Sequence, residues 1–216
     1  MSGCKGADMS IYLLRHGETD WNKEGRIQGH TDIPLNQNGR LQIAQTAAGL
    51  AGICPDMDLI LCSPLSRARE SARIAADRLS YPEDRIIEEQ LLIERCFGEA
   101  EGLTAAEREE KYPNYQYSDT GYYFPGMESF DDLMGRARNA MERIVNLSRN
   151  KQNTLVVSHG AFLAAVITAV TDGKIPYFSD TISLDSGSLF RVCYTDRAVE
   201  LAKYSIEGTL FTDINF

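Results

Sequence analysis

The sequence of 216 residues predicts an α/β fold: a three-layer sandwich in which helices cover both faces of a mostly parallel sheet, with a C-terminal hairpin. Two observations predict it. Short apolar runs, which are typical of strands buried on both faces, alternate along the chain with longer segments of helical periodicity. Polar residues come directly after three of these runs, as they do where parallel strands end at a ligand site.

The strands are expected at apolar runs that polar residues bound on both sides. Ile11–Leu14, 58–63 ("DLILCS") and 154–157 ("TLVV") have this pattern, and 85–89 ("RIIEE") is a weaker candidate. From "SGSLFRVCYTD" to "AVELAKYSI", apolar and polar residues alternate. This predicts a hairpin of two strands around Thr195–Arg197.

The helices are expected between these runs. The segment 34–51 has Asn36 as a plausible N-cap, and its expected apolar face is made of Leu41, Ala44, Ala48 and Ala51. Further helices are expected at 65–79, 104–112, 128–150 and 161–173. Ser129 is a plausible N-cap of the third of these, and Gly173 is expected to end the last.

Composition excludes several classes of protein. The formal net charge of −9 gives the chain no global attraction to nucleic acid or to anionic membranes, so a bound anion needs locally gathered positive charge. The N-terminal "MSGCKGADMS" has no signal-peptide core, and the longest apolar stretch, "AFLAAVITAV", is about half of the roughly 20 residues that span a bilayer. We therefore expect a cytoplasmic protein with no nucleic-acid or membrane partner. Without internal repeats or linkers, one domain is expected over residues 1–216.

The cysteines and histidines give no metal-binding pattern. Five cysteines, an odd number without a Cys-x-x-Cys pair, argue against a disulfide framework and a structural zinc site and fit reduced thiols. The two histidines that follow apolar runs have arginines nearby, which repel cations. No metal is expected.

Three expected strand ends carry polar groups that could converge at one edge of the sheet. These groups are Arg15–Gly17, Ser63 with Arg67, and Ser158–Gly160. A lone histidine is more often structural, but a second apolar run that ends in His-Gly favours a two-histidine site. Guanidinium groups pair bidentately with phosphate and stay charged, so phosphate is the expected anion. Gly17 is expected to leave room for it, helix N-termini to add donors, and His30 to be peripheral.

The motifs resemble those of one family. "LLRHGETDWN", "GRIQGHTDIPLNQNGR", "CSPLSRARESA", "LLIERCFGEAEG", "PGMESFDDLMGRA" and "TLVVSHG" occur in this order from Ile11 to Gly160. Together they resemble the histidine phosphatase superfamily, with its phosphoglycerate-mutase-like branch the nearer match. The "RHGET" signature is specific by itself, and the other motifs make a chance match improbable.

The resemblance implies roles for individual residues. His16 would be the nucleophile that becomes a phosphohistidine, and Glu94 would be the proton donor to the leaving group. The residues implied to cradle the phosphoryl oxygens are Arg15, Arg67 and His159, and the implied further contacts to phosphate or substrate are Asn22, Gln28, Gly29 and Gly160. No cofactor is implied. Taken without the motif, Glu94 reads as an ion-pair partner of Arg95 or of another nearby arginine, and Asn22 as a cap or turn residue.

The family contains phosphatases, bisphosphoglycerate-dependent phosphoglycerate mutases and members without catalysis. Between Cys96 and Leu133 the only cations are Arg108 and Lys111, and the tyrosine-rich segment 112–124 predicts either a neutral lid or simple loop packing. We therefore expect a phosphomonoester hydrolase for small phosphorylated metabolites, with one phosphate on a less charged or partly apolar body. The alternatives are a bisphosphoglycerate-dependent phosphoglycerate mutase and a non-enzymatic phospholigand-binding module. A homodimer is left open.

Overall fold

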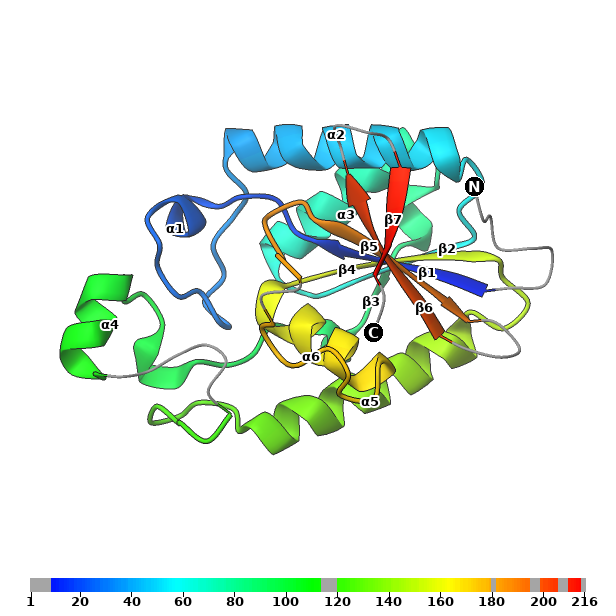
Figure 1. The fold of residues 1–216 in the computed structure, drawn as a ribbon. Helices are drawn as coiled ribbons and strands as arrows, with labels where there is room; N and C mark the ends of the chain where they lie inside the picture. The colour runs from blue at the N-terminus through cyan, green and yellow to red at the C-terminus, as the bar shows by residue number, and fades with distance from the viewer. Residues whose placement is uncertain (1–8, 114–119, 180–181, 195–198, 206–209, 215–216) are drawn as a thin grey trace.

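A seven-stranded sheet is the centre of the computed structural model, which describes residues 9–113, 120–179, 182–194, 199–205 and 210–214 (Figure 1). The strands are β1 (Met9–Arg15), β2 (Leu59–Cys62), β3 (Ile87–Glu88), β4 (Asn153–Ser158), β5 (Leu189–Tyr194), β6 (Val199–Ser205) and β7 (Leu210–Ile214). Their order in the sheet is β3-β2-β4-β1-β5-β6-β7. The first four strands of this order are parallel, and β5, β6 and β7 are antiparallel. The predicted mostly parallel sheet is confirmed.

Helices cover both faces of the sheet, as predicted. Helices α2 (Gln37–Ile53) and α3 (Ser66–Arg78) lie on one face, and α5 (Phe130–Leu147) and α6 (Gly160–Val170) lie on the other (Figure 1). Two short helices, α1 (Asp20–Lys23) and α4 (Ala105–Lys111), lie at the left of Figure 1, beyond the carboxyl end of β1. Single 3₁₀ turns are formed by η1 (Glu83–Arg85), η2 (Gln90–Leu92) and η3 (Gly98–Ala100).

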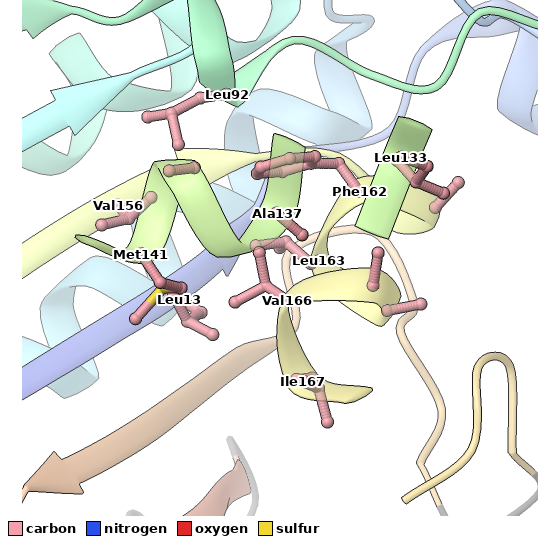
Figure 2. Packing of buried hydrophobic residues seen from close by; sticks show 14 of the residues in the cluster. Leu13, Leu92, Leu133, Ala137, Met141, Val156, Phe162, Leu163, Val166 and Ile167 are labelled. Carbon is pink, nitrogen blue, oxygen red and sulfur yellow. The ribbon is translucent and has the colours of Figure 1, made fainter. Parts of the chain in front are cut away.

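The central strands are apolar throughout because both of their faces are buried. In β1, Ile11 and Leu13 face the core under α5 and α6, whereas Tyr12 and Leu14 face the core under α2 and α3. Figure 2 shows side chains of the first core, with residues of α5 and α6 packed against the sheet near Leu13. Because β1 is packed on both faces of the sheet, the residues at its carboxyl end are held in position.

The expected apolar face of the first long helix is wrong. Leu41 of α2 is 57% exposed, and the buried apolar residues of the helix are Ile43, Ala47 and Leu50. The segment is rich in alanine, which fits both a buried and an exposed face, so its periodicity is a weak signal. The predicted N-cap is confirmed, since the side chain of Asn36 accepts a hydrogen bond from the N–H of Gly39 at 2.8 Å.

Other boundaries differ more modestly from the predictions. The candidate strand at 85–89 is reduced to the two exposed residues of β3 at the sheet edge, and α1 and β7 were not predicted. The last predicted helix ends at Val170, and Gly173 lies beyond it with a φ of +76°. The C-terminal hairpin is confirmed by the pairing of Tyr194 with Val199, and its turn at Thr195–Arg197 lies outside the described residues.

The cysteines are not all reduced. Cys54, Cys62 and Cys96 are free thiols. Cys193 in β5 is disulfide-bonded, so the expectation of reduced thiols is wrong at this position. Among the described helices, none is long and apolar enough to cross a membrane.

The end of β1 is held tightly against the start of α2. A Cβ atom added at Gly17 would lie 2.3 Å from the carbonyl oxygen of Gly39, and one added at Gly39 would lie 2.1 Å from the carbonyl oxygen of Glu18. Gly17 is therefore needed for the approach of the α2 backbone. The expectation that it leaves room for phosphate is wrong, because the atoms in its way are protein.

Replacing Gly17 by alanine tests this contact. Two backbones would have to separate, so Gly17→Ala is expected to lower the free energy of unfolding by about 1–3 kcal/mol or more. The matched control is Gly135→Ala in α5, where an added Cβ meets nothing within 4 Å. That change is expected to raise stability by about 0.5–1 kcal/mol, since alanine is the better helix former. Urea unfolding of both variants measures the difference, and equal effects would contradict the contact.

Candidate active site

A cavity of about 270 Å³ opens at the carboxyl end of the parallel strands. It gathers side chains from the end of β1, the 22–29 segment, α3, the 94–97 segment and the start of α6. The predicted site residues that line it are Arg15, His16, Asn22, Gln28, Gly29, Arg67, Glu94 and Gly160. His159 is not in the lining, but its ring meets the ring of His16 edge-on, with centroids 5.1 Å apart.

His16 is held as a neutral ring with one nitrogen unprotonated. Its Nδ1 lies 2.7 Å from the carbonyl oxygen of Gly17, which can only accept, so Nδ1 carries the proton. Burial lowers the pKa of His16 well below its usual 6.5, and the charges of Arg67 and Arg15 lower it further. The lone pair of a neutral ring with this tautomer is on Nε2.

Arg67 is a fully buried cation. Its Nη1 donates to the carbonyl oxygen of Thr31 at 2.9 Å, its Nη2 to that of Gly29 at 2.8 Å, and its Nε to Nδ1 of His159 at 3.2 Å. Burial lowers the pKa of Arg67 to about 10, which still leaves the guanidinium charged at neutral pH. The cavity therefore has a fixed positive charge at its inner end.

Arg15 adds a second cation beside the first. Its guanidinium donates to the carbonyl oxygen of Leu184. It lies across the first turn of α6, where a Cβ added at Gly160 would be 3.3 Å from its Cζ. The missing side chain of Gly160 thus admits the guanidinium of Arg15 next to the cavity.

His159 is neutral because it is buried and because one of its ring nitrogens accepts a hydrogen bond. Nδ1 accepts from Arg67, so the proton is on Nε2, which lies 2.7 Å from the hydroxyl oxygen of Ser63. Burial lowers the pKa of His159 well below 6.5, and the charge of Arg67 lowers it further. The donor nitrogen of His159 faces Ser63.

Glu94 is fixed by backbone N–H groups. Its Oε1 accepts from the N–H of Arg95 at 2.8 Å and of Phe162 at 2.9 Å, and its Oε2 accepts from the N–H of Ala161 at 3.2 Å. The alternative of an ion pair with Arg95 is wrong, since that guanidinium donates to the carbonyl oxygen of Glu128 at 3.1 Å. The expectation that helix N-termini serve phosphate is also wrong for these two N–H groups of α6, which hold Glu94.

The loop that carries Glu94 has a further anchor in Arg136. This side chain donates to the carbonyl oxygens of Leu91, Ile93 and Glu94 and pairs with the carboxylate of Glu128 at 2.7 Å. His30 also reaches the loop, with Nε2 at 2.8 Å from the carbonyl oxygen of Glu94. The expectation that His30 is peripheral is therefore wrong, because its ring contacts the loop that carries Glu94.

Thr19 orients two amide side chains at the cavity. Its N–H donates to Oδ1 of Asn22 at 3.1 Å, and its hydroxyl lies 2.8 Å from Oε1 of Gln28. With both oxygens directed to Thr19, the NH₂ groups of Asn22 and Gln28 are left for the cavity, which both residues line. Asn22 also has its alternative role, because it completes a capping box with Thr19 at the start of α1.

Glu101 fixes the turn that supplies the partners of Arg67. Its carboxylate accepts from the N–H groups of His30, Thr31 and Phe97, each at 3.0 Å, and from the Thr31 hydroxyl at 2.7 Å. Burial raises the pKa of Glu101, but these hydrogen bonds outweigh it and lower the pKa below its usual value. Gly29 has a φ of +52°, and a Cβ there would lie 2.0 Å from Oε1 of Glu101. Gly29 is thus required by the shape of the turn.

Sequence reasoning missed or undervalued several residues of the site, namely Thr19, Ser63, Glu101 and Phe178. Ser63 had one signal, its position directly after an apolar run. Phe178 lines the cavity from a segment after α6 that has no recognisable motif. Among the residues that the structure describes, no group of three or more His, Cys, Asp or Glu side chains is placed to hold a metal ion.

The neutral histidines predict a pH dependence of stability. Because the folded-state pKa values of His16 and His159 lie below 6.5, the unfolded chain takes up more protons as the pH falls through 6.5. The stability that the two neutral histidines contribute is complete above pH 6.5. It is lost as the pH falls towards their lowered folded-state pKa values. The melting temperature is therefore expected to fall between about pH 7 and pH 5.

The variant His159→Gln tests the share of His159 in this pH dependence. Glutamine can accept from Arg67 and donate to Ser63, but it takes up no proton in this range. Its melting temperature is expected to fall less steeply than that of the wild type, measured by calorimetry over the same pH range. Equal slopes in the two proteins would contradict a neutral His159 in the folded state.

Comparison with known proteins assigns the chain to a family. A model of the histidine phosphatase superfamily (branch 1) matches residues 11–207. An uncharacterized phosphatase, PhoE, of Bacillus subtilis is 33% identical over 201 residues, which cover 93% of this chain and 96% of that protein. A 2,3-bisphosphoglycerate-dependent phosphoglycerate mutase 2 of Gloeobacter violaceus is 34% identical over 163 residues, 73% of each chain.

A solved structure extends the likeness to the fold. Phosphoserine phosphatase of Entamoeba histolytica, in complex with 3-phosphoglyceric acid, has a TM-score of 0.74 and 26% identity, covering 94% of this chain and all of that chain. The agreement of fold, motif order and family match leads to one conclusion: the chain belongs to branch 1 of the histidine phosphatase superfamily.

Proposed function

We propose that this chain is a phosphomonoester hydrolase that acts on small phosphorylated metabolites through a phosphohistidine at Nε2 of His16, within a single domain over residues 1–216. One observation carries the proposal. The ring of His16 has its proton on Nδ1 and its lone pair on Nε2, in a cavity that Arg15 and Arg67 make positive. A neutral imidazole beside two fixed cations suits attack on a phosphate dianion.

In the first step, Nε2 of His16 attacks phosphorus and the bond from phosphorus to the ester oxygen breaks. Arg15 and Arg67 stabilise the negative charge on the equatorial oxygens as the transition state forms. The NH₂ groups of Asn22 and Gln28 donate to the same oxygens. His159 acts through its hydrogen bond to Nε of Arg67, which holds the guanidinium in place.

Glu94 supplies the proton that the leaving oxygen needs. Two backbone N–H groups occupy Oε1, whereas one occupies Oε2. Since each carboxyl oxygen has about two lone pairs, Oε2 has room for the proton. Protonation turns the leaving alkoxide into a neutral alcohol. In the second step the carboxylate takes a proton from water, which attacks the phosphohistidine and releases inorganic phosphate and the free His16.

The phosphoglycerate mutase remains the alternative, because one relative has that name. A mutase must hold a second charged group at the far end of its substrate. In the described lining of the cavity, the cation beyond Arg15 and Arg67 is Arg26, which already pairs with Glu24 at 2.6 Å and with Glu107 at 3.3 Å. This pairing favours the hydrolase.

Hydrolysis of p-nitrophenyl phosphate between about pH 5 and 7 tests the proposal. Wild-type protein is expected to turn the ester over without added metal, and His16→Ala is expected to be inactive because the attacking nitrogen is removed. Turnover that survives His16→Ala would contradict the mechanism. Phosphate binding without turnover of any phosphoester would favour a binding module. Interconversion of 2- and 3-phosphoglycerate that requires bisphosphoglycerate would favour the mutase.

Glu94→Gln separates the acid from the nucleophile. We expect kcat/KM for an alkyl phosphate to fall by about 10²–10⁴, since the alkoxide then leaves without a proton. The loss for p-nitrophenyl phosphate should be much smaller, because p-nitrophenolate leaves unaided. The control is Glu99→Gln, whose side chain is 59% exposed and pairs with Lys111. An equal loss for both esters would rule out Glu94 as the acid.

A further inference from the structure

Part of the wall of the cavity is apolar. Ile27, Phe97, Ala161 and Phe178 line it together with the charged residues already described. Three of these adjoin motif residues of the site, since Ile27 precedes Gln28, Phe97 follows Glu94 closely and Ala161 follows Gly160. Phe178 comes from a separate segment, so no neighbouring motif residue explains its position in the lining of the cavity.

Phe178 has an unfavourable backbone conformation. It is the third residue of a four-residue turn, in which the N–H of Ser179 donates to the carbonyl oxygen of Pro176 at 3.1 Å. The φ of Phe178 is +51°. A positive φ at this turn position favours glycine or asparagine, and it is rare for a bulky residue. Such strain persists where the surroundings enforce it, and it concentrates at ligand sites. A phenylalanine is thus held where glycine would fit better, with its side chain in the lining of the cavity.

The turn is attached to the loop that carries the acid. The ring of Phe178 packs on the ring of Tyr177 with centroids 4.7 Å apart. Tyr177 is buried, and its ring packs on Phe130 and under the guanidinium of Arg95, whose neighbour is Glu94. This stack fixes the ring of Phe178 relative to Glu94, where the leaving group must lie.

Arg26, the cation of the described lining beyond Arg15 and Arg67, already has partners. The guanidinium of Arg26 donates to the carboxylates of Glu24 and Glu107 and to the carbonyl oxygen of Gly102 at 2.7 Å. A substrate carboxylate would have to compete with two carboxylates for this cation. The wall therefore suits an uncharged leaving group with an apolar face.

We propose that Phe178 is a specificity-determining residue whose ring contacts the leaving group and selects phosphomonoesters of uncharged alcohols or phenols with an apolar face. The proposal rests on the proposed hydrolase function. It assigns Phe178 no part in the chemistry at phosphorus, so removing its ring should affect substrates according to their leaving group.

The test compares kcat/KM for 1-naphthyl phosphate and for 3-phosphoglycerate in wild type, Phe178→Ala and Phe178→Gly. Both variants are expected to lose about tenfold or more on the naphthyl ester and less than about threefold on the carboxylated ester. Glycine suits the positive φ better than alanine does. If the ring itself makes the contact, Gly and Ala lose equally, whereas a purely structural role of the turn predicts that Gly retains more activity. The control is Tyr123→Ala, which removes an exposed aromatic ring outside the cavity lining.

A second measurement separates this proposal from the proposed function. Phenylphosphonate and phosphonoacetate cannot be hydrolysed as esters, so calorimetry measures their binding whether or not the protein turns over a substrate. Phe178→Ala should weaken phenylphosphonate about tenfold and leave phosphonoacetate and inorganic phosphate unchanged. Equal weakening of all three ligands, or of none, would overturn the role of Phe178. Absence of turnover in wild type with selective weakening intact would instead overturn the hydrolase.

Discussion

The burial of the guanidinium of Arg67 is the constraint on which the rest of the site depends. A buried guanidinium needs hydrogen-bond acceptors for its N–H groups. Nε, Nη1 and Nη2 of Arg67 donate to a histidine nitrogen and to two carbonyl oxygens. Burial of the rings lowers the pKa values of His16 and His159, and the charges of Arg67 and Arg15 lower them further. In the proposed mechanism, the same Arg67 cation attracts a phosphate dianion and helps burial to keep the nucleophile His16 unprotonated.

The partners of Arg67 in turn determine the geometry around them. The carbonyl groups of Gly29 and Thr31 can meet the guanidinium only because the turn has a left-handed residue at Gly29 and because Glu101 collects its N–H groups. The turn also presents Gln28 to the cavity, and His30 reaches from it to the loop of Glu94. The proposed phosphate cradle and the proposed acid, Glu94, are therefore parts of one hydrogen-bonded unit, and disturbing the turn should disturb both.

The sequence predicted those features that reside in short contiguous stretches. The apolar runs of β1, β2 and β4 and the polar residues at their ends are local signals, and they sufficed for the fold class and for the convergence of Arg15, His16 and Arg67. Contacts between residues distant in the chain left no such signal. Glu101 contacts a turn about seventy residues away, and the strained turn of Phe178 has no motif. Gly17 was expected to leave room for phosphate. In the folded chain its neighbour is the backbone of Gly39, which lies far from it in the sequence.

In the proposed mechanism, the carbonyl group of Gly17 holds the proton of His16 on Nδ1, so that Nε2 attacks phosphorus. The most direct measurement is ¹⁵N NMR of protein labelled at histidine, first free at neutral pH and then after rapid reaction with a phosphoester. We expect a neutral ring with an unprotonated Nε2 in the free protein, and phosphorus coupled to Nε2 in the trapped intermediate. A doubly protonated His16 at neutral pH, or phosphorus on Nδ1, would contradict it.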